Sequence, residues 1–119
     1  MSLITGSERT IDTAQSALQG LWAHQQLIAD NLANVDTPGY SAGRFDFDSF
    51  MKDALSGEPA HPISAYQHNL PGASHRTDGN SVDIDSEMVL LSSNSLRYQG
   101  VLSQLGRKMT LLNTVIRDS

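Results

Sequence analysis

Apolar side chains recur at alternating steps of four and three residues along the C-terminal third of the chain. All but one of these positions are apolar or aromatic; they are Ile84, Met88, Leu91, Ser95, Tyr98, Leu102, Leu105, Met109, Leu112 and Ile116. Such spacing, kept over about four heptads, is typical of a helix that packs along its length against a partner helix. Acids at 83–87 and bases at 107–117 suit the two ends of a helix dipole. The pattern therefore predicts a helix from about residue 85 to 116.

The N-terminal third carries a looser form of the same pattern. Its positions are Ile11, Ala14, Leu18, Leu21, Gln25, Ile28, Leu32 and Val35. Proline disfavours helical geometry at Thr37, and Pro38 with Gly39 supplies the central pair of a type II turn. Asn34 suits a left-handed, helix-ending conformation. We therefore expect a first helix that ends in a turn before Tyr40.

Two helices with one apolar stripe each predict an antiparallel, coiled-coil-like hairpin in which the stripes pack together. The distribution of charges favours this pairing, because the two helices carry opposite charges. Residues 10–43 contain acids and no Lys or Arg, whereas residues 88–117 contain bases and no acid. We expect an all-α fold in one domain. Its parts are an N-terminal axial helix and turn over 1–40, a largely irregular middle segment over 41–80, and a C-terminal axial helix over 81–119.

The middle segment departs from this pattern. Phe47, Phe50, Met51 and Leu55 predict one short amphipathic helix that ends at Gly57. Beyond it, prolines, glycines and polar clusters argue against regular structure. Long irregular stretches are uncommon in compact domains, and we expect this one to become fully ordered only against neighbouring molecules.

The outward faces of the two predicted helices carry few charges. They are rich in amides, hydroxyls and scattered aliphatic side chains, where a solvated hairpin normally carries Glu and Lys. This composition is typical of helix faces that meet further protein. A weakly charged, solvated surface is the alternative interpretation.

Bulk properties narrow the range of functions. A chain of 119 residues suits one domain, and a net charge of -5 argues against nucleic-acid binding. No apolar run of about 18 residues predicts a membrane span, and the N-terminal sequence lacks the basic and apolar regions of a cleavable secretion signal. The absence of cysteine removes disulfides and thiolate chemistry.

The middle segment contains three histidines that are candidate metal ligands. His61, His68 and His75 could bind a metal, but zinc ligands are held in closer spacings and solvated loop histidines are the simpler interpretation. The acids of 78–87 fail the EF-hand register because Gly79 follows the first acid directly. No nucleophile elbow or phosphate-binding glycine loop occurs. We therefore expect no enzyme activity and no cofactor.

Two blocks of sequence carry a family resemblance. Residues 29–40, ADNLANVDTPGY, resemble the A-x-N-(I/L)-A-N-x-x-T-x-G-Y signature of flagellar axial proteins, the rod and hook subunits. Residues 78–87, DGNSVDIDSE, and 94–99, NSLRYQ, are similar to segments of proximal-rod components of the basal body. One departure is that Ser41 occupies the family's basic position and Arg44 comes one place late.

The resemblance implies a structural subunit of the proximal rod that self-assembles into a helical tube. It also implies export without a cleavable signal through the flagellar type III apparatus, and assembly in the periplasm with other rod proteins and inner-membrane ring components, without membrane insertion. We expect assembly and packing to rest on Leu18, Leu21, Ile28, Asn31, Leu32, Asn34, Thr37, Pro38, Gly39, Tyr40, Met88, Leu91, Tyr98, Leu102, Leu105, Met109 and Leu112. Two alternatives remain open: a soluble helical-hairpin adaptor, and a metal-binding module that uses the middle histidines.

Overall fold

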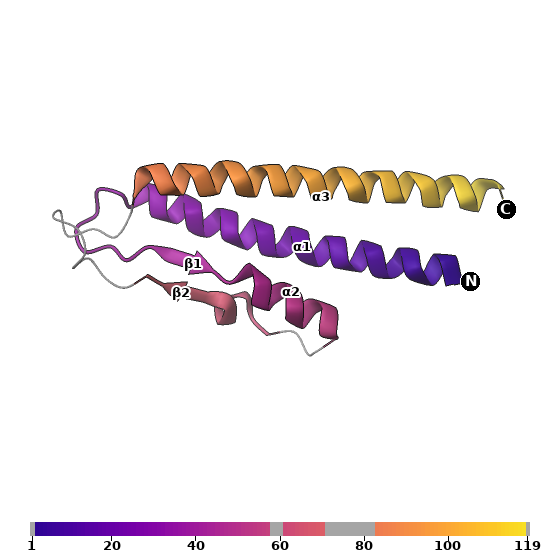
Figure 1. Cartoon of the computed structure of the whole chain (residues 1–119), viewed down its shortest axis with the longest axis horizontal. Coiled ribbons are helices and arrows are strands. Elements are labelled where there is room, and N and C mark those ends of the chain that lie inside the picture. Colours follow the sequence, from indigo (N-terminus) through magenta and orange to yellow (C-terminus); the bar gives the residue numbers. More distant parts are fainter. Residues whose placement is uncertain (1, 58–60, 71–82, 119) are drawn as a thin grey trace.

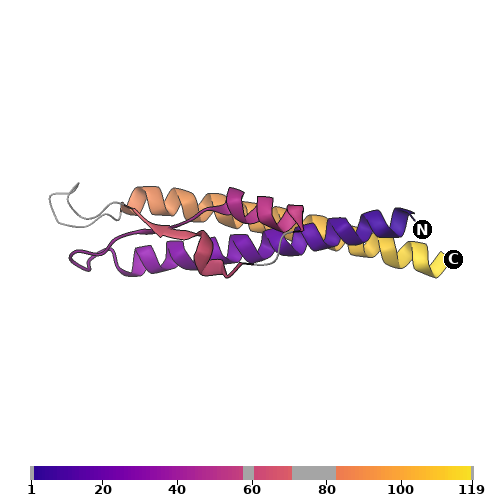
Figure 2. The same cartoon turned by 90° about the horizontal axis from the view of Figure 1, so that it is seen from below.

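The computed structural model describes residues 2–57, 61–70 and 83–118 (Figure 1). In chain order the elements are α1 (Ser2–Ala33), β1 (Gly43–Phe45), α2 (Phe47–Ser56), a 3-10 helix (Ile63–Tyr66), β2 (Gln67–Asn69) and α3 (Ile84–Asp118). The molecule is elongated, with principal extents of 65 × 27 × 14 Å. Helices α1 and α3 lie side by side and antiparallel in both views (Figures 1 and 2), so the start of α1 and the end of α3 share one end. The predicted mostly helical fold with long packed terminal helices is confirmed.

The face that α3 turns toward α1 differs from the predicted stripe by a small rotation of the helix. The buried and half-buried positions at heptad spacing are Glu87, Leu91, Asn94, Tyr98, Val101, Leu105, Lys108 and Leu112. Met88, Leu102 and Met109 remain 47%, 51% and 52% exposed, and therefore do not fill the hairpin as the pattern predicts. The cause is chemical, because Glu87 and Asn94 find hydrogen-bonding partners inside the hairpin and take the place that apolar spacing assigns to Met88 and Ser95.

The aromatic core lies on the other side of α1, against the middle segment. Ala23 of α1 meets Phe45, Phe50 and Tyr66, which are all buried. The rings of Phe45 and Phe50 lie 5.6 Å apart, and the ring of Tyr66 meets Phe50 edge-on at 5.4 Å. Helix α1 is consequently the central layer of the molecule, between α3 and the middle segment (Figure 1).

Helix α2 forms where its amphipathic pattern predicts it. The carboxylate of Asp46 accepts a hydrogen bond from the Ser49 N–H at its start, and Gly57 ends it with a left-handed φ of 75°. The helix packs closely on α1 at Gly20, where an added Cβ would lie 2.7 Å from a carbon of the Phe50 ring. A side chain at position 20 would therefore push α2 outward.

The described part of the middle segment is more regular than the sequence predicts. Strands β1 and β2 pair antiparallel, with Arg44 opposite His68 at the centre of the pair. The expectation of irregular structure beyond α2 is wrong for residues 63–69, while 58–60 and 71–80 lie outside the described residues. All three β2 side chains are exposed, so this strand is held by its backbone and leaves no alternating apolar signal in the sequence.

The turn that follows α1 has the predicted geometry at its second half. The N–H of Tyr40 donates to the Thr37 carbonyl at 3.2 Å, and Gly39 has a φ of +77°. Asn34 is not left-handed, so that prediction is wrong, because no described residue other than glycine has a positive φ. Its side chain instead donates to the Asp30 carbonyl and accepts from the Thr37 hydroxyl, which fixes the end of α1.

Candidate functional site

The most connected polar group in the hairpin is the carboxamide of Asn31, which is fully buried on α1. Its nitrogen donates to the Gly43 carbonyl at 2.9 Å and to Glu87 Oε2 at 3.1 Å. Its oxygen accepts from the Gly43 N–H at 2.8 Å and from the Tyr40 hydroxyl at 3.3 Å. Both donors and both acceptor positions of the amide are therefore used, which is what a buried amide requires.

Glu87 brings a negative charge into this buried region from the first turn of α3. It is fully buried, and its Oε1 lies 2.7 Å from the Arg44 guanidinium, whose side chain is 22% exposed. Arg44 also donates to the Gly43 carbonyl at 3.0 Å. A buried carboxylate is tolerated only with such partners, because an unpaired buried charge is strongly destabilising.

We call Asn31, Tyr40, Gly43, Arg44 and Glu87 the polar cluster. Its members come from the end of α1, from the turn and β1, and from the start of α3, so it ties together three segments that are distant in sequence. Burial, reinforced by the carboxylates of Asp30 and Glu87, raises the pKa of Tyr40, which keeps its hydroxyl protonated. Directional hydrogen bonds fix the lengthwise register of α1 against α3, whereas apolar contacts alone tolerate sliding.

A second polar contact lies one heptad further along α3. The buried Asn94 amide donates to the Leu21 carbonyl at 2.9 Å and to Gln25 Oε1 at 2.8 Å. Gln25, the polar interruption of the predicted α1 stripe, is thus a partner for α3. Next to it, the half-buried His24 ring stacks on Phe45 at a centroid distance of 6.4 Å.

The environment of His24 disfavours its charged form. Burial is the main cause that lowers its pKa from 6.5, and the cations of Arg44 and Arg97 add to the effect. A hydrogen bond with Asn94 and the charge of Glu87 oppose it more weakly. His24 is therefore a neutral ring at the junction of α1, β1 and α3.

The structure distributes the residues that the sequence singles out over three environments. Those that are buried are Leu21, Ile28 and Asn31. Those that are half-buried are Leu18, Leu32, Asn34, Tyr40, Leu91, Tyr98, Leu105 and Leu112. Those that are exposed are Thr37, Pro38, Gly39, Met88, Leu102 and Met109. Only Asn31 and Tyr40 among them belong to the polar cluster.

Sequence reasoning missed Arg44, Glu87 and Asn94 as packing residues. Glu87 and Asn94 are one heptad apart and flank Leu91, so a heptad analysis that admitted polar residues would have found them. In the sequence, Arg44 stands out only as a departure from the family pattern. Its partner is Glu87 of the same chain.

The metal-binding alternative gains no support from the described residues. His61 and His68 are exposed there, and His75 lies outside that part of the chain. No group of three or more His, Cys, Asp or Glu in residues 2–57, 61–70 and 83–118 is placed to hold a metal ion. None of the helices among these residues is long and apolar enough to cross a membrane.

A long hairpin locked by a polar cluster, with extensive exposed helix faces, is the architecture of a structural subunit. The model of the flagella basal body rod protein family matches residues 11–40. The chain is 31% identical to flagellar basal body rod protein FlgB of Bacillus subtilis over 98% of this chain and 97% of the relative. It is 33% identical to FlgB of Salmonella typhimurium and 34% identical to FlgB of Escherichia coli, each over 87% of this chain and about 90% of the relative.

The chain belongs to the FlgB family of flagellar basal body rod proteins. The resemblance predicted from residues 29–40 and 78–99 is confirmed, and the chain is a structural subunit of the basal-body rod. The signature residue Asn31 and Glu87 of the second block meet in the polar cluster, so the two recognised blocks meet in space.

Proposed function

We propose that the chain is a non-enzymatic proximal-rod subunit that joins copies of itself and other rod proteins into a helical tube. The observation that carries the proposal is the large number of exposed apolar side chains along α3. They are Ile84, Met88, Val89, Leu96, Leu102, Met109, Leu111, Val115 and Ile116, each at least 45% exposed. Single exposed apolar residues are ordinary, but nine on one helix is typical of a helix that meets further protein.

The hairpin itself leaves this surface uncovered. Helix α1 contacts the Glu87, Asn94 and Val101 side of α3, and the middle segment packs on the far side of α1 (Figure 1). Leu96 and Leu102 therefore remain 70% and 51% exposed in the described part of the subunit. Contacts between different surfaces of identical subunits extend into helical assemblies when they do not close into a ring.

The remaining parts of the proposal rest on the family. We infer that the subunit passes through the flagellar type III export apparatus and is incorporated in the periplasm, next to inner-membrane ring components and other rod proteins. The charge-poor helix faces support burial against protein after export. The adaptor and metal-binding alternatives are not favoured, because the family consists of rod proteins.

The test is a pair of substitutions on the exposed face of α3. Leu102→Lys with Met109→Lys places two charges where the proposal buries apolar side chains. We expect a folded subunit with unchanged helix content by circular dichroism, and cells that build few or no rods when this is their sole copy. The matched control is Ser103→Lys with Thr110→Lys, which changes exposed polar positions of the same helix. Normal rods with the first pair would contradict the proposal.

A further inference from the structure

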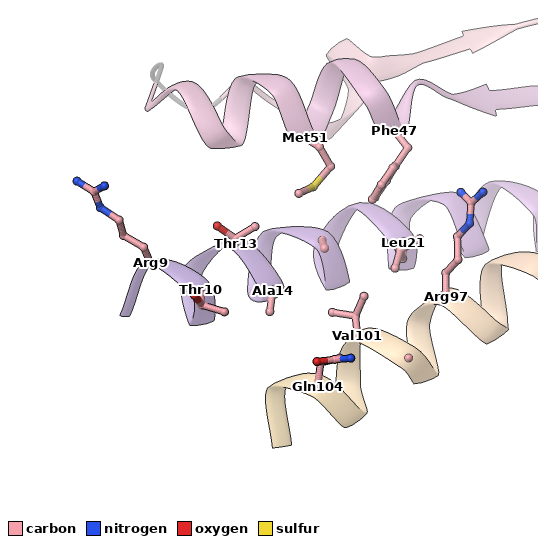
Figure 3. Close-up of a pocket in the computed structure, with 12 residues that line it drawn as sticks. Arg9, Thr10, Thr13, Ala14, Leu21, Phe47, Met51, Arg97, Val101 and Gln104 are labelled. Carbon is pink, nitrogen blue, oxygen red and sulfur yellow. The ribbon is translucent and has the colours of Figure 1, made fainter. Parts of the chain in front are cut away.

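A groove lies between the N-terminal half of α1, α2 and the middle of α3 (Figure 3). Its volume is about 700 Å³, and apolar side chains form most of its wall. The principal wall residues are Ala14, Ala17, Leu21, Phe47, Met51 and Val101. Figure 3 shows Met51 and Phe47 pointing from α2 toward α1, while Val101 faces α1 from the other side.

Small residues in the sequence leave the space of the groove open. Ala14 and Ala17 on α1, and Gly100 on α3, lie where larger side chains would fill the space between the helices. The surrounding core is well packed, since Ala17 and Leu21 are buried. Interiors normally leave few voids, so an apolar groove of this size on a structural subunit is suited to receive another side-chain face.

Two cations mark the ends of the groove. Arg9 and Arg97 lie at opposite ends in Figure 3, and none of the described residues that line the groove is acidic. Arg97 is exposed and forms no ion pair within residues 2–57, 61–70 and 83–118. The groove therefore fits a segment that combines apolar side chains with an acid and carries no base.

Such a segment is present at the start of α3. Ile84, Met88 and Val89 are 50%, 47% and 68% exposed within the first two turns of the helix. Asp85 is exposed beside them, and no Lys or Arg occurs between residues 83 and 96. We call residues 84–89 the acidic end.

We propose that the groove of one subunit receives the acidic end of a second copy, with Asp85 near Arg97. This inference rests on the proposed function, because it supposes that copies of the chain assemble together. Within one chain the acidic end lies about 16–24 Å along α3 from the level of Gly100, at about 1.5 Å per residue. The two surfaces are therefore different and offset, and their contact extends from copy to copy when the rotation between copies does not close.

Charge reversal tests the pairing in cells whose own copy of the gene is deleted. Arg97→Glu alone sets Glu against Asp85, and Asp85→Arg alone sets Arg against Arg97, so each variant repels its own copies. We expect either one to lower the number of completed rods by about tenfold or more. Co-expression of the two variants restores both attractive pairings, and rods should return to near the wild-type number.

The remaining outcomes decide against the proposal. Rods built normally by either single variant would overturn it, and so would two blocked variants that stay blocked when co-expressed, the result expected if a different rod protein fills the groove. Lys52→Glu, an equal reversal on the exposed side of α2, is the control when it is combined with Asp85→Arg in one chain, and this double variant must remain blocked. The Leu102→Lys and Met109→Lys pair distinguishes failure of the proposed rod function from failure of the pairing between groove and acidic end. It tests assembly through α3 without altering either the groove or the acidic end.

Discussion

Asn31 Nδ2 lies 3.1 Å from Glu87 Oε2, a hydrogen bond between residues that are 56 positions apart in the chain. Asn31 belongs to the last turns of α1 and Glu87 to the first turn of α3, so this contact fixes where the two long helices begin to run together. Because Asn31 also holds the backbone of Gly43, the same amide sets where the chain leaves α1 and returns toward α2.

Replacing Asn31 by Asp tests whether its donor atoms matter. The change is nearly isosteric, but it removes two N–H donors and places a carboxylate against Glu87. We expect the free energy of unfolding to fall by about 3 kcal/mol or more, because a buried acceptor loses its donor and meets a like charge. Urea unfolding followed by circular dichroism measures the loss. Asn113→Asp on the exposed side of α3 is the matched control and should stay within about 0.5 kcal/mol of wild type.

The ion pair of Arg44 and Glu87 should show strong coupling. Arg44→Met leaves a fully buried carboxylate without its cation, and we expect a loss of about 3–5 kcal/mol. Glu87→Gln keeps the shape of the side chain and removes its charge. Arg44→Met should therefore lower the free energy of unfolding much less in the Glu87→Gln protein than in wild type. A double-mutant cycle by urea unfolding gives the coupling energy. Additive effects of the two substitutions would show that the pair contributes nothing specific.

Gly20 should tolerate no side chain. In Gly20→Ala the new methyl group meets the Phe50 ring at 2.7 Å, so α2 must shift, and we expect a loss of about 1–3 kcal/mol despite the better helix propensity of alanine. Gly106→Ala on α3 meets nothing within 4 Å and should stabilise the protein by about 0.5–1 kcal/mol. The midpoint temperature of thermal unfolding should fall for Gly20→Ala and rise for Gly106→Ala, relative to wild type. A shared increase in stability would rule out the close packing of α2 on α1.

His24 makes the hairpin sensitive to acid. Its pKa is lowered in the folded protein, so the unfolded chain binds more protons in the interval below pH 6.5. The contribution of the neutral His24 ring to the free energy of unfolding is complete above pH 6.5. This contribution is lost as the pH falls through the folded-state pKa. His24→Gln should therefore flatten the dependence of the unfolding free energy on pH between about 7.5 and 5.

The long helices were predictable because their signals are local. Heptad spacing, the acids before Ile84 and the Pro38–Gly39 turn act within a few residues, and the structure places both helices and α2 accordingly. The face of α3 was not predictable by the same rule. Apolar spacing predicts that Met88, and not Glu87, faces α1. The burial of Glu87 becomes favourable only through its partners in α1 and β1, which are distant in sequence.

The polar cluster and the small sheet escaped prediction for a related reason. Three-residue strands carry too few side chains to show alternation, and β2 is exposed at every position. Asn31 was singled out by the family signature, but its four hydrogen bonds depend on the backbone of Gly43 and on Glu87 arriving beside it. Pairwise chemistry across the fold, rather than spacing along the chain, decides those contacts.

The most direct test of the central claim is a density map of the assembled basal-body rod that contains this chain. We predict that the hairpin lies within the rod wall, with Leu102 and Met109 within about 4.5 Å of side chains of a neighbouring subunit. We also predict that the Asn31–Glu87 contact is retained inside each subunit. A map in which both apolar side chains face solvent, or in which the chain forms no part of the rod, would contradict the proposed assembly.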